Sequence, residues 1–134
     1  DGAYDEQTKD AIRKMLKDDI SKVIDAFFTT LTFGTGGLRG LMGVGSNRMN
    51  DYTVRAATQG LANYLKKQPQ AAEGRPLAVL IGYDSRHNSR RFAEETAKVL
   101  AGNGIEAYLF EQLRPTPLVS FGCRLMGCAA AIMI

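Results

Sequence analysis

The chain has 134 residues, of which 45% are hydrophobic and 23% are charged, a composition typical of one folded domain and not of a disordered segment. Its longest apolar run, residues 128–134, is too short for a membrane-spanning helix, so no membrane partner is expected. The net charge of +3 favours small anionic ligands over nucleic acid, whose binding surfaces usually carry a dense stripe of Lys and Arg.

Residues 5–28 are predicted to be helical, because their apolar side chains recur with the period of a helix. Asp18 or Asp19 is a candidate cap within this segment, so the pattern leaves open one bent helix or two. We interpret residues 1–30 as an N-terminal helical extension whose apolar face packs against other parts of the protein. That face consists of Ile12, Met15, Leu16, Ile20, Val23, Ile24, Phe27 and Phe28.

Residues 33–51 contain an unusual concentration of glycine, with six glycines among the 12 residues 34–45. Glycine weakens regular elements by about 0.5–1 kcal/mol relative to alanine, so this run predicts a loop that adopts positive φ or approaches a ligand closely. A short irregular strand over residues 38–44 remains compatible with it. Arg39 has Gly37 and Gly40 close by, which an ordinary solvent-exposed arginine does not require, so the residues alone leave open a ligand-binding role and an ordinary surface position.

The rest of the chain predicts alternating helices and strands. A helix over residues 52–67, capped by Asn50 or Asp51, would bury Val54, Ala57, Leu61, Tyr64 and Leu65, and residues 68–75 form a polar connection. Strands are then expected over residues 77–83, 105–110 and 128–134, with helices over residues 89–101 and from an N-cap at Thr116 to Gly127. This order predicts an α/β fold, a three-layer α/β/α sandwich. The sequence stops at the end of an apolar strand that is expected to be buried, as in a fragment of a larger protein.

Ligands of such sheets bind beyond the carboxyl ends of the strands, where the segment Gly82-Tyr-Asp-Ser-Arg-His87 is expected. We interpret Asp84 and Arg86 as an ion pair that stabilises this turn, and His87 as a side chain that hydrogen-bonds it. A Ser-His-Asp relay within this segment is disfavoured, because the residues are too close in sequence. Six of the ten arginines lie on or beside this turn and the glycine-rich loop, a combination suited to phosphate: Arg39, Arg48, Arg55, Arg86, Arg90 and Arg91.

Several other functions are disfavoured. Residues 34–45 contain no Gly-x-Gly-x-x-Gly, and the P-loop spacing from Gly40 to Gly45 is followed by Ser46-Asn47, so nucleotide binding is not expected. One histidine and two cysteines do not provide a zinc site. Cys123 and Cys128 are interpreted as buried thiols of a reducing cytosol, which predicts a cytoplasmic protein.

Four segments, in this order, resemble the first domain of the α-D-phosphohexomutases: Phe33-Gly-Thr-Gly-Gly-Leu-Arg-Gly40, Gly82-Tyr-Asp-Ser-Arg86, Arg114-Pro-Thr-Pro-Leu118 and Ala130-Ala-Ile-Met-Ile134. The stretch from Gly37 to Asn50 is most similar to the phosphoglucomutase/phosphopentomutase-like branch. The resemblance implies that residues 31–134 form domain I, an α/β/α layout with a mixed four-stranded sheet. It also implies truncation just before the loop that carries the catalytic phosphoserine.

The resemblance further implies an intramolecular phosphotransferase, an isomerase of carbohydrate metabolism. Such an enzyme moves a phosphoryl group between C1 and C6 of a hexose phosphate through a phosphoserine and a bisphosphate such as glucose 1,6-bisphosphate. The expected partners are the hexose phosphate and the remaining domains of the parent protein. Mg²⁺ would be bound mainly by parts absent from these 134 residues, so no catalytic or metal-binding residue is assigned here. A phosphomannomutase or phosphopentomutase is an alternative, as is a non-catalytic anion-binding or interaction module.

The resemblance assigns site roles to only a few residues of this chain. Thr35 and Arg39 match the family segment Thr-Ser-Gly-Leu-Arg, which lines the cleft near the phosphoserine, and Arg39 would contact the phosphoserine or the bisphosphate. Gly36 replaces the common serine, so only backbone contact is expected from Gly36 and Gly37. Asp84 and Arg86 match the family's Gly-x-Asp-x-Arg turn, which supports the cleft wall, and His87 is placed with them.

Overall fold

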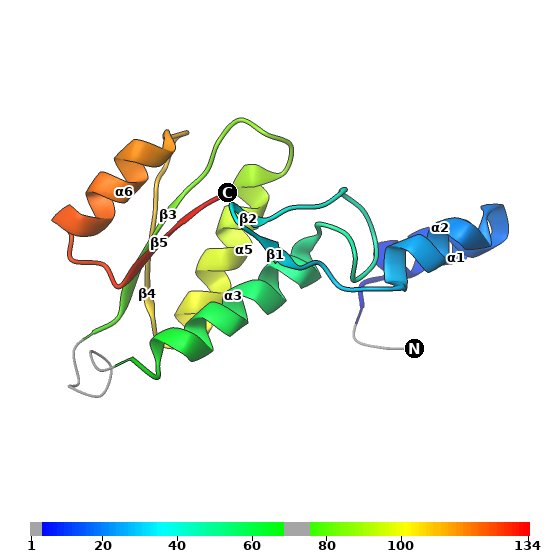
Figure 1. The fold of residues 1–134 in the computed structure, drawn as a ribbon, viewed down its shortest axis with the longest axis horizontal. Coiled ribbons are helices and arrows are strands. Elements are labelled where there is room, and N and C mark those ends of the chain that lie inside the picture. Colours follow the sequence, from blue (N-terminus) through cyan, green and yellow to red (C-terminus); the bar gives the residue numbers. More distant parts are fainter. Residues whose placement is uncertain (1–3, 69–75) are drawn as a thin grey trace. The chain divides into compact units, whose positions relative to one another are not determined.

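The computed structural model describes residues 4–68 and 76–134, and the chain divides into two compact units, Asp1–Thr53 and Val54–Ile134. The first unit holds helices α1 (Glu6–Asp18) and α2 (Ile20–Phe27), strands β1 (Phe33–Gly34) and β2 (Gly37–Leu38), and the start of α3 (Asp51–Leu65). The second holds the rest of α3 and then β3 (Ala78–Gly82), α5 (Ser89–Gly102), β4 (Glu106–Leu109), α6 (Thr116–Leu125) and β5 (Ala130–Met133) (Figure 1). The predicted connection over residues 68–75 lies, apart from Gln68, outside the described residues.

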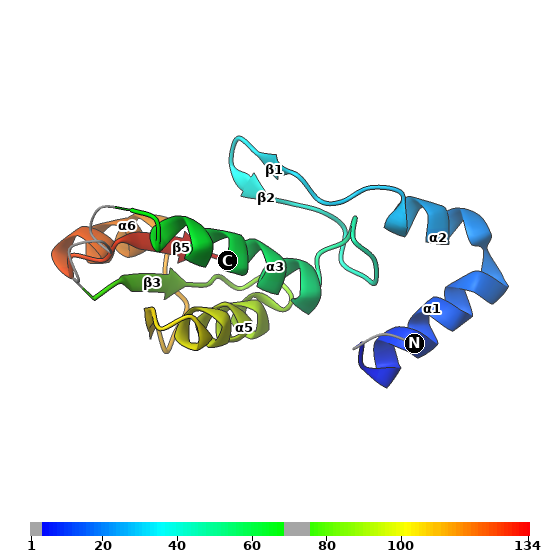
Figure 2. The ribbon, with the colours of Figure 1, turned by 90° about the horizontal axis from the view of Figure 1, so that it is seen from below.

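The N-terminal segment forms two helices because a second cap lies inside it. Asp5 caps α1 by accepting a 2.8 Å hydrogen bond from the backbone N–H of Thr8. Asp19 has an extended backbone and caps α2 by accepting from the backbone N–H of Ser21 at 2.9 Å. Figure 2 shows the turn of the chain between α1 and α2. The cap at Asp19 therefore decides between the two alternatives that the apolar pattern left open.

The predicted packing of the apolar face of these helices is not found. Ala26 is the only buried residue of α1 and α2, whereas Ile20, Ile24 and Phe28 are 59%, 56% and 85% exposed. The helical period of these apolar residues correctly indicates that the segment is helical. It contains no information about what covers that face, and the described residues do not cover it.

The glycine-rich loop is tied to the end of α2. The backbone N–H of Asn47 donates to the carbonyl of Ala26 at 3.0 Å, and the Ser46 hydroxyl donates to the carbonyl of Thr29 at 2.7 Å. Gly45 has a φ of +130°, and a β-carbon there would overlap the Ala26 carbonyl. Glycine is required at this position because the loop backbone both adopts positive φ and passes directly against the helix.

The strand predicted over residues 38–44 is found only in part. β1 and β2 form an antiparallel hairpin that pairs Phe33 with Leu38 and Gly34 with Gly37, and Met42 makes an isolated bridge with Met49. Asn50 then begins α3, because its Oδ1 accepts from the backbone N–H of Thr53 at 3.0 Å. Asn50 is therefore a capping residue, one of the two alternatives left by the sequence.

The second unit contains the predicted α/β arrangement. Its sheet has the strand order β4-β3-β5, and both strand pairs are parallel. Helix α6 covers one face of the sheet, and α3 and α5 cover the other (Figure 1). Among the described residues the sheet has three strands, so the mixed four-stranded sheet is not confirmed; β1 and β2 pair only with each other.

The side chains of the central strand β3 point alternately to the two faces of the sheet, and both sets are buried. Val79 and Ile81 lie in the core cluster with residues of α3 and α5, whereas Leu80 contacts the opposite helix α6 near Gly122. Strand β3 is buried on both faces, as its apolar run predicts. Strand β5, expected to be buried, is only partly so, because it lies at an edge of the three-stranded sheet.

Helix α3 buries the expected face only in part: Val54 and Leu65 are buried and Leu61 is half-buried against the core, but Tyr64 is not buried. Its buried residues are Val54, Thr58, Ala62 and Leu65, and Tyr64 is 60% exposed. Small side chains suit this position, because the Thr58 and Thr96 hydroxyls lie 3.4 Å apart where α3 approaches α5. In α5, the residues Phe92, Thr96 and Leu100 recur at helical spacing and are all buried.

In α6, only Val119 of the large apolar side chains is buried, while Leu118, Phe121 and Leu125 are more than 40% exposed. The expected N-cap is displaced by one residue, because Pro115 is the N-cap and Thr116 is already helical. Cys123 and Cys128 are free and half-buried, not fully buried as expected, and the Cys123 thiol lies 3.6 Å from the carbonyl oxygen of Cys128.

Glu95 of α5 is a buried carboxylate held by two cations. Its carboxylate accepts from Lys98 Nζ at 2.6 Å and from Arg55 Nη2 of α3 at 2.6 Å. The hydrogen bond from Lys98, with a further contribution from Arg55, lowers the pKa of Glu95 below its usual 4.5. The charged form is therefore favoured by folding, and its contribution to stability is present above the unfolded-state pKa.

We expect Glu95→Gln to destabilise the chain at pH 7 by about 1.5 kcal/mol, the lower range for a hydrogen bond to a charged group, because Arg55 is half-exposed. This difference should shrink as the pH falls below 4.5 and through the lower pKa of the folded state, where wild-type Glu95 is also neutral. Urea unfolding of wild type and Glu95→Gln at pH 7 and at pH 3 measures the difference in the free energy of unfolding at each pH. A difference that does not change with pH would contradict this explanation.

Candidate functional site

Three of the segments singled out in the sequence meet at the carboxyl edge of the sheet. The backbone N–H of Asp84 donates to the carbonyl of Ile134 at 2.9 Å. The backbone N–H of Ile134 in turn donates to the carbonyl of Gly82 at 3.0 Å. The N–H of Arg114 donates to the carbonyl of Tyr83 at 3.2 Å. The ends of β3 and β5 and the segment after β4 are therefore held together at the edge where ligands of parallel sheets bind.

Gly82 lets α6 approach this edge. A β-carbon at Gly82 would overlap Cγ2 of Val119 and would lie 3.3 Å from the sulfur of Met133. Because Val119 is buried, it has little space into which to move. The glycine before the Tyr-Asp-Ser-Arg segment thus has a packing role that the sequence pattern did not reveal.

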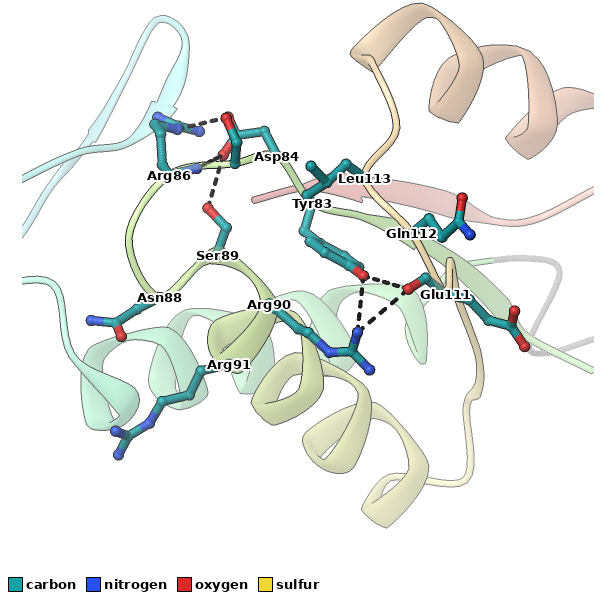
Figure 3. Close-up of a pocket in the computed structure, with 11 residues that line it drawn as sticks. Tyr83, Asp84, Arg86, Asn88, Ser89, Arg90, Arg91, Glu111, Gln112 and Leu113 are labelled. Carbon is teal, nitrogen blue, oxygen red and sulfur yellow. Dashed lines mark hydrogen bonds and ion pairs between the residues drawn. The ribbon is translucent and has the colours of Figure 1, made fainter.

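Asp84 organises the turn that follows β3 (Figure 3). Its Oδ1 accepts from the backbone N–H of Arg86 and from the Ser89 hydroxyl, each at 2.9 Å, and its Oδ2 accepts from Arg86 Nε at 2.7 Å. These bonds, the backbone one first, lower the pKa of Asp84. The expected Asp84–Arg86 ion pair is confirmed, and the hydrogen bond from Ser89 to Asp84 links the turn to the first residue of α5.

His87 does not hydrogen-bond the turn, contrary to expectation. Its side chain is exposed and has no hydrogen bond or ion pair within the described part of the chain. The reason is that the neighbouring Arg86 and Ser89 occupy the Asp84 carboxylate. The same contacts argue against a relay through Ser85, His87 and Asp84.

An open cavity of about 630 Å³ lies beside this turn. Tyr83, which is 4% exposed, donates its hydroxyl to the carbonyl of Glu111 at 2.6 Å, and Arg90 Nη1 lies 3.5 Å from both oxygens. Arg90 also pairs with Glu94, whereas Arg91 points away from Arg90 (Figure 3). The sequence analysis did not identify Tyr83 and Glu111 as residues that line this cavity. The position of Tyr83 at the end of an apolar strand could have indicated it.

The β1–β2 hairpin carries the other candidate residues. Thr35 and Gly36 form its two-residue turn, and Gly37 has a φ of +107°, a conformation that favours glycine. Arg39 follows β2 directly and is exposed. Its guanidinium lies over the turn, because a β-carbon at Gly36 would overlap Nη2 of Arg39. The hairpin thus brings Thr35, Gly36, Gly37 and Arg39 together, and it lies in the first unit, whereas the Asp84 turn lies in the second.

Arg39 differs from most of the arginines that the sequence grouped with it. Arg48 pairs with Asp25, Arg55 with Glu95, Arg86 with Asp84 and Arg90 with Glu94. Arg39 has no ion pair or hydrogen bond to any described residue. Arg91 has an interaction as well, so five of the six candidate arginines have partners, and Arg39 is the one without a partner among the described residues.

Membrane insertion and metal binding are two further properties that residues 4–68 and 76–134 could have. No helix there is long and apolar enough to cross a membrane. Nor does that part of the chain contain a group of three or more His, Cys, Asp or Glu side chains that could hold a metal ion.

Comparisons with known proteins place this fold in a family. Residues 30–134 match the family described as phosphoglucomutase/phosphomannomutase, alpha/beta/alpha domain I. A probable phosphoribomutase of Schizosaccharomyces pombe is 41% identical over 132 residues, which cover 97% of this chain and 22% of that protein. A phosphoglucomutase of Staphylococcus haemolyticus is 42% identical over 108 residues, covering 81% of this chain and 19% of that protein.

No solved structure matched the chain significantly. The chain spans only about a fifth of the length of these curated relatives. The family match nevertheless covers the hairpin, the Asp84 turn and the whole three-stranded sheet. The chain therefore belongs to the phosphoglucomutase/phosphomannomutase family and carries its α/β/α domain I.

Proposed function

We propose that this chain is the first domain of a phosphosugar mutase that moves a phosphoryl group between C1 and C6 of a hexose phosphate. In this reaction an enzyme phosphoserine transfers its phosphoryl group to the free hydroxyl of the sugar phosphate. The resulting bisphosphate, glucose 1,6-bisphosphate for a glucose substrate, returns its other phosphoryl group to the serine. The observation that carries the proposal is the meeting of three family-like segments at the carboxyl edge of the sheet.

The position of the strand ends supports a role in presenting the phosphoserine. The family resemblance puts the phosphoserine loop directly after the Ile-Met-Ile strand, and Ile134 is hydrogen-bonded to Asp84 and Gly82. A loop that continues from Ile134 would thus leave the sheet beside the Asp84–Arg86 turn. Because β5 is held by β3 and α6, such a loop would have a rigid base, which precise positioning of a reacting group requires.

Arg39 is proposed to bind the phosphoryl group during transfer. Phosphoryl transfer depends mainly on positioning and on stabilising charge over the phosphate oxygens. An unpaired guanidinium offers several N–H donors in a fixed planar arrangement, which suits a phosphate. Thr35 and the backbone of Gly36 and Gly37 are proposed to line the same site. We propose, as the family resemblance implies, that ligands for Mg²⁺ come mainly from other parts of the parent protein.

The substrate is proposed to be a glucose phosphate, with a mannose or pentose phosphate as the alternative. Two relatives of nearly equal similarity are called phosphoglucomutase and probable phosphoribomutase, so their names alone do not choose between hexose and pentose. The choice needs a direct assay of the full-length parent protein.

We expect the full-length protein to convert glucose 1-phosphate to glucose 6-phosphate with a higher kcat/KM than it converts ribose 1-phosphate. The 134-residue chain alone should convert neither, because none of its residues matches the family phosphoserine. Coupled assays with each substrate, after addition of catalytic glucose 1,6-bisphosphate, measure both. A higher kcat/KM for ribose 1-phosphate would favour a pentomutase, and phosphate binding without any turnover by the full-length protein would favour a non-catalytic anion-binding module.

A further inference from the structure

Two cysteines flank the connection between α6 and β5 (Figure 1). Cys123 lies in the last turn of α6, and Cys128 lies just before β5. Both are free and half-buried, and residues 124–127 between them are all exposed, so small molecules in solution can reach this part of the chain. The thiol of Cys123 lies 3.6 Å from the carbonyl oxygen of Cys128 and is therefore directed toward the other cysteine.

The backbone between the two cysteines forms a Schellman motif, an arrangement that ends many α-helices. Gly127 has a φ of +64°, and its N–H donates to the carbonyl of Arg124 at 3.3 Å. The N–H of Cys128 donates to the carbonyl of Cys123 at 2.9 Å. In this motif the side chains of the two residues at its ends commonly contact each other, and here both of those residues are cysteine.

The hydrogen bond between Cys123 and Cys128 also limits the distance between their Cα atoms. Given the covalent dimensions of the backbone, these atoms lie no farther apart than the distances of up to about 6.8 Å that disulfides usually span. The ionisation of Cys128 is a further sign that the sulfur atoms are close. Burial raises the pKa of the Cys128 thiol, and the nearby Cys123 and Glu106 raise it further.

We propose that Cys123 and Cys128 form a redox modification site, where a low-molecular-weight disulfide such as glutathione disulfide converts both thiols into one intramolecular disulfide. The inference is independent of the mutase activity. The thiolate of one cysteine attacks a sulfur of glutathione disulfide, whose S–S bond breaks, and one glutathione leaves and takes up the proton that the cysteine lost. The thiolate of the other cysteine then attacks the protein sulfur of this mixed disulfide and releases the second glutathione. The protein thiols thus lose two electrons in total, which reduce glutathione disulfide to two molecules of glutathione.

The fold should favour this disulfide because the surrounding backbone is already held in place. The N–H of Ala129 donates to the carbonyl of Ala78 at 2.8 Å, which attaches the residue after Cys128 to the central strand β3. The Schellman motif holds Cys123 on the other side of the connection. Because folding brings the two thiols together, the disulfide in turn should stabilise the folded chain.

The test equilibrates the full-length protein with glutathione and glutathione disulfide, blocks the free thiols with iodoacetamide and digests the protein with trypsin. Trypsin cleaves after Arg124, between the two cysteines, so their peptides stay together only when a disulfide joins them. We expect the joined peptides from the native protein. The equilibrium constant for their formation should be about 10-fold or more above that of the protein unfolded in urea, because the fold holds the thiols together.

The single variants Cys123→Ser and Cys128→Ser are the matched controls. Each should form only a mixed disulfide with glutathione, and neither should show the rise in melting temperature that oxidation should cause in the wild type. Separate wild-type peptides under the most oxidising conditions would overturn the inference, as would an equilibrium constant equal to or below that of the unfolded protein. Absence of mutase activity in the full-length protein would instead contradict the proposed function and leave this inference unaffected.

Discussion

Replacing Arg39 with alanine in the full-length protein is expected to reduce kcat/KM for glucose 1-phosphate by about 10- to 150-fold. The loss corresponds to about 1.5–3 kcal/mol, the range for one hydrogen bond to a charged group. The reason is that the Arg39 guanidinium has no partner among residues 4–68 and 76–134 and lies over the hairpin turn at Gly36, so its N–H groups are available to a phosphoryl group. Steady-state kinetics of the purified variant measure the loss.

Two further variants show whether the effect belongs to this guanidinium. Arg39→Lys keeps the charge but loses the planar pair of donors, so its kcat/KM should lie between those of wild type and Arg39→Ala. Arg124→Ala removes another exposed arginine that has no partner in the described chain, and it should keep wild-type kcat/KM. Equal kcat/KM for wild type and Arg39→Ala would remove Arg39 from the site.

Leu100→Ala is expected to destabilise the chain by about 2–5 kcal/mol, the range for truncating a fully buried leucine. Leu100 of α5 is 0% exposed and belongs to the core cluster with Val79, Ile81 and Leu65. Truncation removes buried apolar surface and leaves a cavity between α5 and the sheet, which the surrounding side chains fill only partly. Equilibrium urea unfolding of the 134-residue chain measures the difference in the free energy of unfolding.

Leu125→Ala is the matched control, because it makes the same chemical change at a leucine that is 73% exposed. Its effect should stay within about 0.5 kcal/mol, as is usual for surface substitutions. If Leu100→Ala and Leu125→Ala lowered the free energy of unfolding by similar amounts, the described core would not be what stabilises the chain.

The order and type of the elements in the second unit could be predicted because each element carries a strong local signal. Strand β3 is an apolar run buried on both faces, and α5 carries Phe92, Thr96 and Leu100 at helical spacing. The predicted buried face of α3 was wrong at Tyr64, a large residue that the helical spacing placed on that face. Tyr64 is exposed because α3 approaches α5 through the small residues Thr58 and Ala62.

The candidate site was predictable in part. Glycine spacing singled out Arg39, and the position after β3 singled out Asp84 and Arg86, whose ion pair the structure contains. The structural roles of Arg48 and Arg55 could not be predicted, because their partners Asp25 and Glu95 lie far from them in sequence. A basic residue beside a candidate loop has the same local pattern whether it binds a ligand or a distant carboxylate.

The amino-acid sequence by itself determined the α/β class, the boundaries of most elements and the motifs that resemble the mutase family, because these depend on local spacing and residue type. Only the tertiary structure decided that the ends of β3 and β5 and the segment after β4 meet at one edge, and that most of the candidate arginines are paired. It also decided that Arg39 lies over Gly36. These features arise from contacts between particular side chains and backbone groups in three dimensions, which no periodicity along the chain encodes.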